Sequence, residues 1–192
     1  MTNPFMQLHN KSISRLLLTT FLTITSIASF AQKVGLGMDF FGYADNREYG
    51  SKYTIPKTFF GVTISPNLYF ELEGNHRIYG GLHFNQEFGK HIENKSRINP
   101  IAYYNYKTEK FDFALGFIPR YNRLKNIPRM ILADTLFYDR PNLEGMYFNY
   151  QNSNVQQSVF IDWMSKQGPS KREQFIAGIS GKYSFGKFFV SN

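Results

Sequence analysis

His83 and Glu87 lie four residues apart in a stretch where polar and apolar residues alternate. In a β-strand this spacing places both side chains on one face. A histidine that is oriented by a polar neighbour can act as a general base, here on a lipid or a peptide. No serine is visibly placed as its nucleophile, because Ser65 is expected opposite Asn85, two positions from His83. We therefore favour a structural role for this face, the lining of a polar interior, over catalysis.

Eight polar or charged residues are expected to line this interior. They are Asp39, Asn67, His83, Glu87, Lys107, Asp112, Arg120 and Asp162. Inward charges of this kind could set the selectivity of a channel, or could pair across neighbouring strands. No two histidines of residues 32–192 have the spacing of metal ligands, and the strand glycines form no phosphate-binding loop. We expect no catalytic, cofactor or metal site, and a protein that is not an enzyme.

A pair of strands within residues 59–89 must position His83. Apolar side chains occupy one face of this pair and polar side chains the other, with a period of two. The apolar positions are Phe60, Val62, Ile64, Leu68, Phe70, Leu72, Ile78, Leu82, Phe84 and Phe88. Paired residues share a face, so the connecting loop must have an odd length, and residues 74–76 fit. This loop would place Asn67 opposite His83.

Eight strand-like runs follow residue 31. They span residues 34–43, 59–73, 77–89, 97–108, 111–120, 143–151, 155–166 and 173–185. A two-residue turn at positions 109–110 would place Lys107 opposite Asp112. Residues 121–141 form the longest irregular stretch and could hold a short helix or an extra hairpin. Short and longer connections alternate along the chain, which is typical of bacterial outer-membrane β-barrels and has no reason to arise in a soluble β-sandwich.

The predicted fold is all-β, an antiparallel meander of about eight long strands that forms all or part of a transmembrane β-barrel in residues 32–192. Residues 188–190 look like the start of a ninth strand after a short turn. Barrel proteins usually end on an aromatic residue that closes the last strand, whereas this chain ends on Asn192. We therefore expect the N-terminal part of a larger barrel, with an eight-stranded barrel and a short tail as the alternative.

Residues 1–31 have the features of a signal peptide. Lys11 and Arg15 precede an uncharged run at 16–28, and residues 29–31 offer small side chains to an export peptidase. Removal of this segment leaves 20 of the 22 basic residues and all 14 acidic residues. The charges are dispersed, so we expect no nucleic-acid partner and instead lipid A or an acidic glycan as the counter-charge. The absence of cysteine excludes a disulfide scaffold.

Five segments carry a resemblance to known proteins. They are TFFGVTISP at 58–66, GGLHFNQEFG at 80–89, YDRPNLEG at 138–145, IDWMSKQ at 161–167 and KREQFIAGISGKYSFG at 171–186. Through these segments the chain resembles uncharacterised exported outer-membrane β-barrel proteins of Bacteroidetes-type bacteria. The resemblance implies a fold and an outer-membrane location, and it implies no particular substrate.

The favoured function is therefore a passive one in the outer membrane, as a porin-like pore, a transport component or a surface scaffold. Outer-membrane lipids and the barrel-assembly machinery are the expected partners. One alternative is an outer-membrane hydrolase that acts on lipids and depends on His83. The other is a soluble, secreted β-sandwich that binds glycans through its aromatic side chains.

Overall fold

Nine antiparallel strands form one sheet in the computed structural model, with neighbours in the order of the sequence. The structure describes residue 19 and residues 33–47, 57–89, 97–124, 127, 132 and 135–192. The strands are β1 (Lys33–Arg47), β2 (Lys57–Leu72), β3 (His76–Glu87), β4 (Arg97–Lys107), β5 (Phe111–Pro119), β6 (Asn142–Gln151), β7 (Val155–Ser165), β8 (Gln174–Phe185) and β9 (Phe188–Ser191). This meander confirms the predicted fold class, and the ninth strand lies where the sequence placed it.

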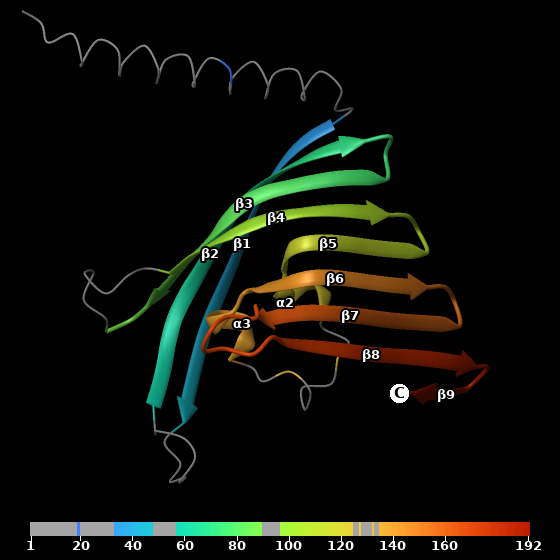
Figure 1. Cartoon of the computed structure of the whole chain (residues 1–192). Helices are drawn as coiled ribbons and strands as arrows, with labels where there is room; N and C mark the ends of the chain where they lie inside the picture. The colour runs from blue at the N-terminus through green and yellow to red at the C-terminus, as the bar shows by residue number, and fades with distance from the viewer. Residues whose placement is uncertain are drawn as a thin grey trace, which may run out of the picture.

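The sheet is strongly curved, so that it has a concave and a convex face (Figure 1). The tight connections between β2 and β3, β4 and β5, β6 and β7, and β8 and β9 gather at one end of the strands (Figure 1). Two one-turn helices, α2 (Arg120–Arg123) and α3 (Leu136–Asp139), lie on the concave side. None of the helices in the described part of the chain has the length and apolar character needed to cross a bilayer.

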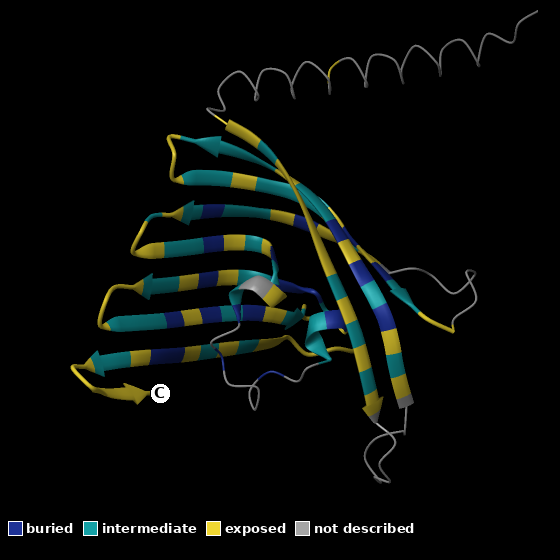
Figure 2. Ribbon diagram, turned by 180° about the vertical axis from the view of Figure 1, so that it is seen from behind, coloured by how far each residue is buried: buried dark blue, intermediate teal, exposed yellow. Residues whose placement is uncertain are grey.

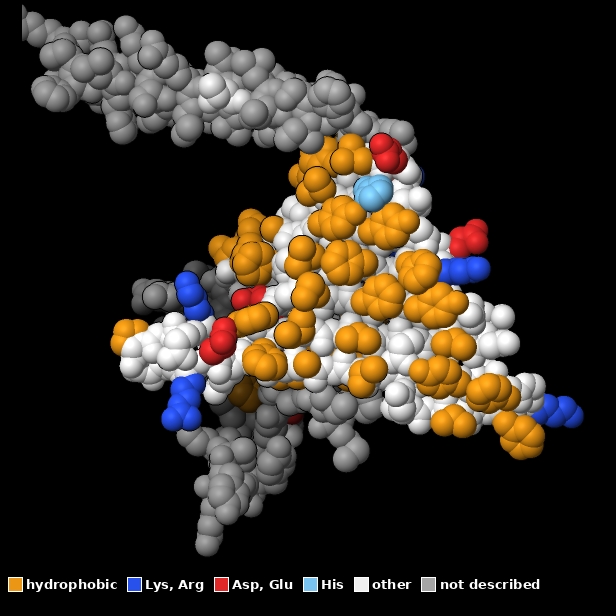
Figure 3. Space-filling model, turned by 45° about the vertical axis from the view of Figure 1, so that its right-hand side comes forward, with side chains coloured by type: hydrophobic (Ala, Val, Ile, Leu, Met, Phe, Trp, Pro, Cys, Tyr) orange, Lys and Arg blue, Asp and Glu red, His pale blue; other side chains and the backbone are white. Residues whose placement is uncertain are grey.

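The predicted alternation of faces is confirmed. Large apolar side chains stand exposed along the convex face, including Leu36 at 86%, Phe40 at 70% and Ile179 at 59% exposure. They gather over the strands as a broad hydrophobic surface (Figure 3). Buried residues alternate with exposed ones along the strands (Figure 2). The described residues form one sheet, so the β-sandwich alternative lacks the second layer against which these apolar side chains would pack.

The turn between β2 and β3 lies one residue earlier than expected, which shifts the pairing of the two strands by two residues. The turn consists of Glu73, Gly74 and Asn75, and Leu72 pairs with His76. Glu73 and Gly74 adopt positive φ angles of 50° and 72°, the left-handed conformation that turns the chain. The prediction that Asn67 faces His83 is wrong, because Asn67 pairs with Gly81. A shift of two residues keeps every side chain on its predicted face and changes only its partner.

The turn between β4 and β5 confirms the predicted register, in which Lys107 pairs with Asp112. The side chain of Asp112 contacts other residues. Asn105 Nδ2 donates a hydrogen bond of 2.7 Å to Asp112 Oδ1, and Arg123 forms an ion pair with the same carboxylate. Arg123 reaches it because α2 folds back over the concave face.

The connection between β5 and β6 fills part of the concave face. Where the sequence allowed a helix or a hairpin, the described residues contain the helices α2 and α3. Leu124, Ile127 and Leu132 from this connection are at most 5% exposed. They join one buried apolar cluster with residues of β5, β6 and β7, namely Ala114, Ile118, Leu143, Tyr147 and Phe160. Removal of this apolar surface from water holds the connection against the sheet.

Candidate active site

Three neighbouring strands bring Asp39, Ser65 and His83 into one row on the concave face. Asp39 of β1 pairs with Ser65 of β2. The register of β2 and β3, fixed by the pairs on either side of Ser65, places Ser65 opposite His83. Ser65 Oγ lies 2.7 Å from His83 Nδ1, and both residues are buried. A buried serine hydroxyl in hydrogen-bond contact with an imidazole is the arrangement that activates a serine nucleophile.

Asn142, the first residue of β6, determines which nitrogen of His83 carries the proton. Its Nδ2 donates a hydrogen bond of 2.5 Å to the carbonyl oxygen of Pro100, which orients the amide. Its Oδ1 therefore faces His83 Nε2 at 2.9 Å and can only accept. Nε2 must then be the donor, so in the neutral ring Nδ1 is free of a proton and accepts from the Ser65 hydroxyl. The ring is thus in the tautomer that a general base requires.

A buried ion pair between Arg120 and Asp162 holds the backbone of Asn142 in place. Arg120 Nη2 donates to the carbonyl oxygen of Asn142 at 2.7 Å and to Asp162 Oδ2 at 2.6 Å, and both charged side chains are fully buried. Asp162 Oδ1 accepts a further bond of 2.9 Å from the backbone N–H of Glu144. Burial lowers the pKa of the Arg120 guanidinium, and the Asp162 carboxylate opposes this effect. The pair fixes the start of β6, and with it the side chain that orients His83.

Ser65 and His83 open into a small pocket of about 70 Å³. Asp39 and Thr63 complete its polar wall, and the other lining residues are Phe40, Phe41, Pro119, Tyr121, Phe137 and Pro141. The rings of Phe41 and Tyr121 lie 5.0 Å apart, and those of Tyr121 and Phe137 lie 6.1 Å apart. Ser65 and His83 therefore face an aromatic wall, which suits a ligand with an apolar part.

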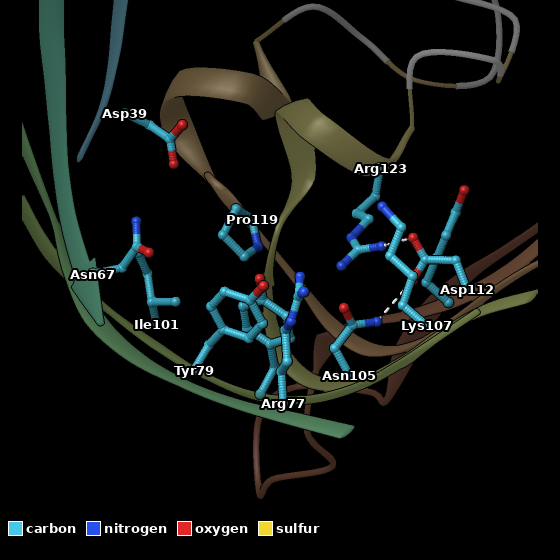
Figure 4. Close-up of a pocket in the computed structure, with 12 residues that line it drawn as sticks. Asp39, Asn67, Arg77, Tyr79, Ile101, Asn105, Lys107, Asp112, Pro119 and Arg123 are labelled. Carbon is cyan, nitrogen blue, oxygen red and sulfur yellow. Dashed lines mark hydrogen bonds and ion pairs between the residues drawn. The ribbon is translucent and has the colours of Figure 1, made fainter. Parts of the chain in front are cut away.

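Two larger pockets adjoin this one. An open pocket of about 700 Å³ shares Phe41, Tyr121 and Phe137 with it, and is otherwise lined mainly by apolar and aromatic residues of β1, α3 and the connection between β5 and β6. A polar pocket of about 320 Å³ shares Asp39 and Pro119 with it (Figure 4). Ser65 and His83 thus lie between an apolar and a polar pocket.

The polar pocket contains half of the predicted interior residues. Asp39, Asn67, Lys107 and Asp112 line it, together with Arg77, Arg123 and a stacked pair of tyrosines, Tyr79 and Tyr103, whose rings lie 4.4 Å apart. Asp39 and Asn67 lie toward one end of it and Lys107 and Asp112 toward the other (Figure 4). His83 lies in the adjoining small pocket.

The remaining predicted residues lie elsewhere. Arg120 and Asp162 form the buried ion pair behind Asn142. Glu87 is the last residue of β3 and is not among the residues that line the three pockets. The idea that Glu87 accompanies His83 in one site is therefore unsupported.

The sequence did not predict that Ser65 and Asn142 contact His83. Ser65 shares its face with His83, and the three-residue loop at positions 73–75 obeys the same odd-length rule as the expected one. A loop at positions 73–75 places Ser65 opposite His83. Asn142 gave no signal, because it lies 59 residues from its partner and is not on an adjacent strand.

A family model described as lipid A 3'-O-deacylase-type matches residues 25–189. The chain belongs to this family. No curated protein matches the chain. A deacylase is an enzyme, so the expectation that the protein is not an enzyme is wrong. Among the hypotheses drawn from the sequence, the lipid A 3'-O-deacylase-type family agrees best with a hydrolase that acts on lipids, and it gives no support to a passive pore.

Proposed function

We propose that the protein is an outer-membrane hydrolase that releases an ester-linked acyl chain from lipid A. Ser65 is the nucleophile, His83 is the general base and Asn142 orients His83. The observation that carries this proposal is the chain of contacts from Ser65 Oγ through His83 to Asn142 Oδ1, at 2.7 Å and 2.9 Å, beside an aromatic pocket. The family match supplies the substrate class.

The first half of the reaction transfers the acyl group to Ser65. Ser65 Oγ forms a bond to the ester carbonyl carbon while its proton moves to His83 Nδ1, and the carbonyl π electrons move onto oxygen. Collapse of this intermediate restores the carbonyl group and breaks the bond to the sugar oxygen. That oxygen takes the proton from His83 and leaves as the sugar hydroxyl.

The second half releases the fatty acid. A water molecule gives a proton to His83 Nδ1 and attacks the acyl carbon on Ser65. The intermediate collapses, Ser65 Oγ takes the proton back from His83, and the fatty acid leaves. Each half places a positive charge on the imidazole, which Asn142 Oδ1 stabilises by accepting from Nε2–H. Asp39, across from Ser65, adds a carboxylate to the same pocket and favours that charge.

The surfaces of the protein support a lipid substrate and a membrane location. The convex face exposes a continuous set of large apolar side chains, as expected of a sheet that contacts hydrocarbon. The connection between β5 and β6 occupies part of the concave face, which favours a site over an open channel. Outer-membrane lipids and the barrel-assembly machinery remain the expected partners.

The test is the mass of lipid A after incubation with the purified, detergent-solubilised protein. We expect the wild type to release one acyl chain, and Ser65→Ala to release none above background. Ser158→Ala is the matched control, because Ser158 is also a buried serine on the concave face but bonds to Asn149. This control should retain activity.

The same experiment can contradict the proposal in two ways. If Ser65→Ala remained active while His83→Ala did not, His83 would activate water directly and Ser65 would not be the nucleophile. If both variants remained fully active, the site itself would be misplaced.

A further inference from the structure

Thr63 has a buried hydroxyl that the fold leaves unused. Thr63 is 3% exposed, and its Oγ1 makes no hydrogen bond to the residues that the structure describes. Buried polar side chains are usually hydrogen-bonded, because an unpaired one destabilises the folded state. A buried donor without a partner at the wall of a pocket is therefore a candidate for contact with a ligand.

The neighbours of Thr63 explain why the hydroxyl has no partner. Across β3 it faces Asn85, whose Oδ1 accepts from Tyr43 at 2.9 Å and whose Nδ2 donates to the carbonyl oxygen of Tyr138 at 2.6 Å. Across β1 it faces Phe41, which has no polar side-chain atom. Asn85 thus uses both polar atoms of its side chain on α3 and β1, so neither neighbour across the strands offers the Thr63 hydroxyl a partner.

Thr63 lies in the same pocket as the catalytic pair. It precedes Ser65 by two residues on β2, so both side chains project from one face of the strand. Residues spaced in this way have Cα atoms about 7 Å apart. An ester carbonyl that is bonded to Ser65 Oγ can direct its oxygen into this interval.

We propose that the Thr63 hydroxyl donates a hydrogen bond to the oxyanion that forms when Ser65 attacks the ester. This inference rests on the proposed function and deepens it. In the transition state the carbonyl oxygen gains negative charge, and a donor already fixed in a buried site stabilises that charge without reorganisation. In the free protein the unpaired Thr63 hydroxyl destabilises the fold, and it gains a hydrogen-bond partner only during the reaction.

Thr63→Val removes the hydroxyl and keeps the shape of the side chain. We expect kcat to fall by about 10²- to 10³-fold, with KM changed little, because the lost contact forms only in the transition state. The melting temperature should stay the same or rise, because the substitution removes an unpaired buried group. Thr63→Ser keeps a hydroxyl and should recover most of kcat.

Thr58→Val is the matched control. Thr58 lies on the same strand, is exposed and bonds to Asn46, so the substitution should leave kcat unchanged. A second readout is the affinity for an alkyl boronic acid, which forms a tetrahedral adduct with a serine nucleophile. Thr63→Val should weaken boronate binding in parallel with kcat, and should leave the affinity for the free fatty acid product unchanged.

The outcomes separate this inference from the proposed function. If Thr63→Val kept the kcat of the wild type while Ser65→Ala was inactive, Thr63 would have no part in the reaction and the proposed function would stand. A fall in kcat accompanied by an equal loss in Thr63→Ser, or by a lower melting temperature, would indicate a structural role and overturn the inference. Full activity of Ser65→Ala would overturn both.

Discussion

The double variant Ser65→Ala/His83→Ala is expected to be as active as either single variant. Each single substitution should lower kcat/KM by about 10⁴-fold or more, because the serine is a poor nucleophile without a base and the base has no function without the serine. Once one member is removed, the other no longer contributes, so the losses do not multiply. This result would establish that the 2.7 Å contact between them is a functional unit.

Initial rates on a long-chain ester in detergent micelles provide the measurement. The control is the pair Ser158→Ala and His83→Ala, because Ser158 bonds to Asn149 and is not among the residues that line the three pockets. Its small effect should multiply with that of His83→Ala. If the Ser65 and His83 losses multiplied instead, the two residues would act independently, and the proposed reaction would not describe this protein.

Arg120→Met should give the largest loss of stability among single substitutions in this site. It leaves the Asp162 carboxylate fully buried without its cation, and it removes the anchor of the Asn142 backbone. Removing one partner of a buried ion pair costs about 3–5 kcal/mol of unfolding free energy. The variant is therefore expected to unfold at a markedly lower urea concentration than the wild type.

The protein contains one tryptophan, and Trp163 adjoins Asp162 on β7, so its fluorescence can follow the unfolding. The double variant Arg120→Met/Asp162→Leu removes both charges and should recover much of the lost stability, because apolar residues of similar size can replace a buried ion pair at little cost. Equal stability of Arg120→Met and the wild type would show that the pair is not important to the fold.

The faces of the strands could be predicted from the sequence because the period of a β-strand is close to two. Leu36 and Phe40 are exposed on the convex face, and Thr63 and His83 are buried on the concave face, as the alternation required. The same rule also gave the pairing of Lys107 with Asp112, because a two-residue turn leaves no other choice.

Partners across the strands were harder to predict. The alternation fixes the parity of a loop and not its position, so turns at 73–75 and 74–76 satisfied it equally well. In the structure Glu73 adopts the left-handed conformation, so the turn begins at Glu73. Glycine adopts this conformation more readily than glutamate, so the sequence favoured a turn that begins at Gly74. A turn one position earlier shifts the pairing of the strands by two residues, and this shift places Ser65 opposite His83.

Contacts across the concave face could not be predicted at all. His83 and Asn142 belong to strands that are not adjacent, and Arg120 and Asp162 meet only because the sheet curves and α2 folds inward. The connection that carries α2 and α3 has no periodic pattern, so its buried residues Leu124 and Leu132 were not identified as core.

The most direct measurement is the site of covalent labelling by an alkyl fluorophosphonate, read by mass spectrometry of the intact protein and its peptides. We expect one phosphonyl group on Ser65, strongly reduced labelling in His83→Ala and none in Ser65→Ala. Labelling of a different residue, or equal labelling of Ser65 with and without His83, would contradict the assignment of Ser65 as a nucleophile activated by His83.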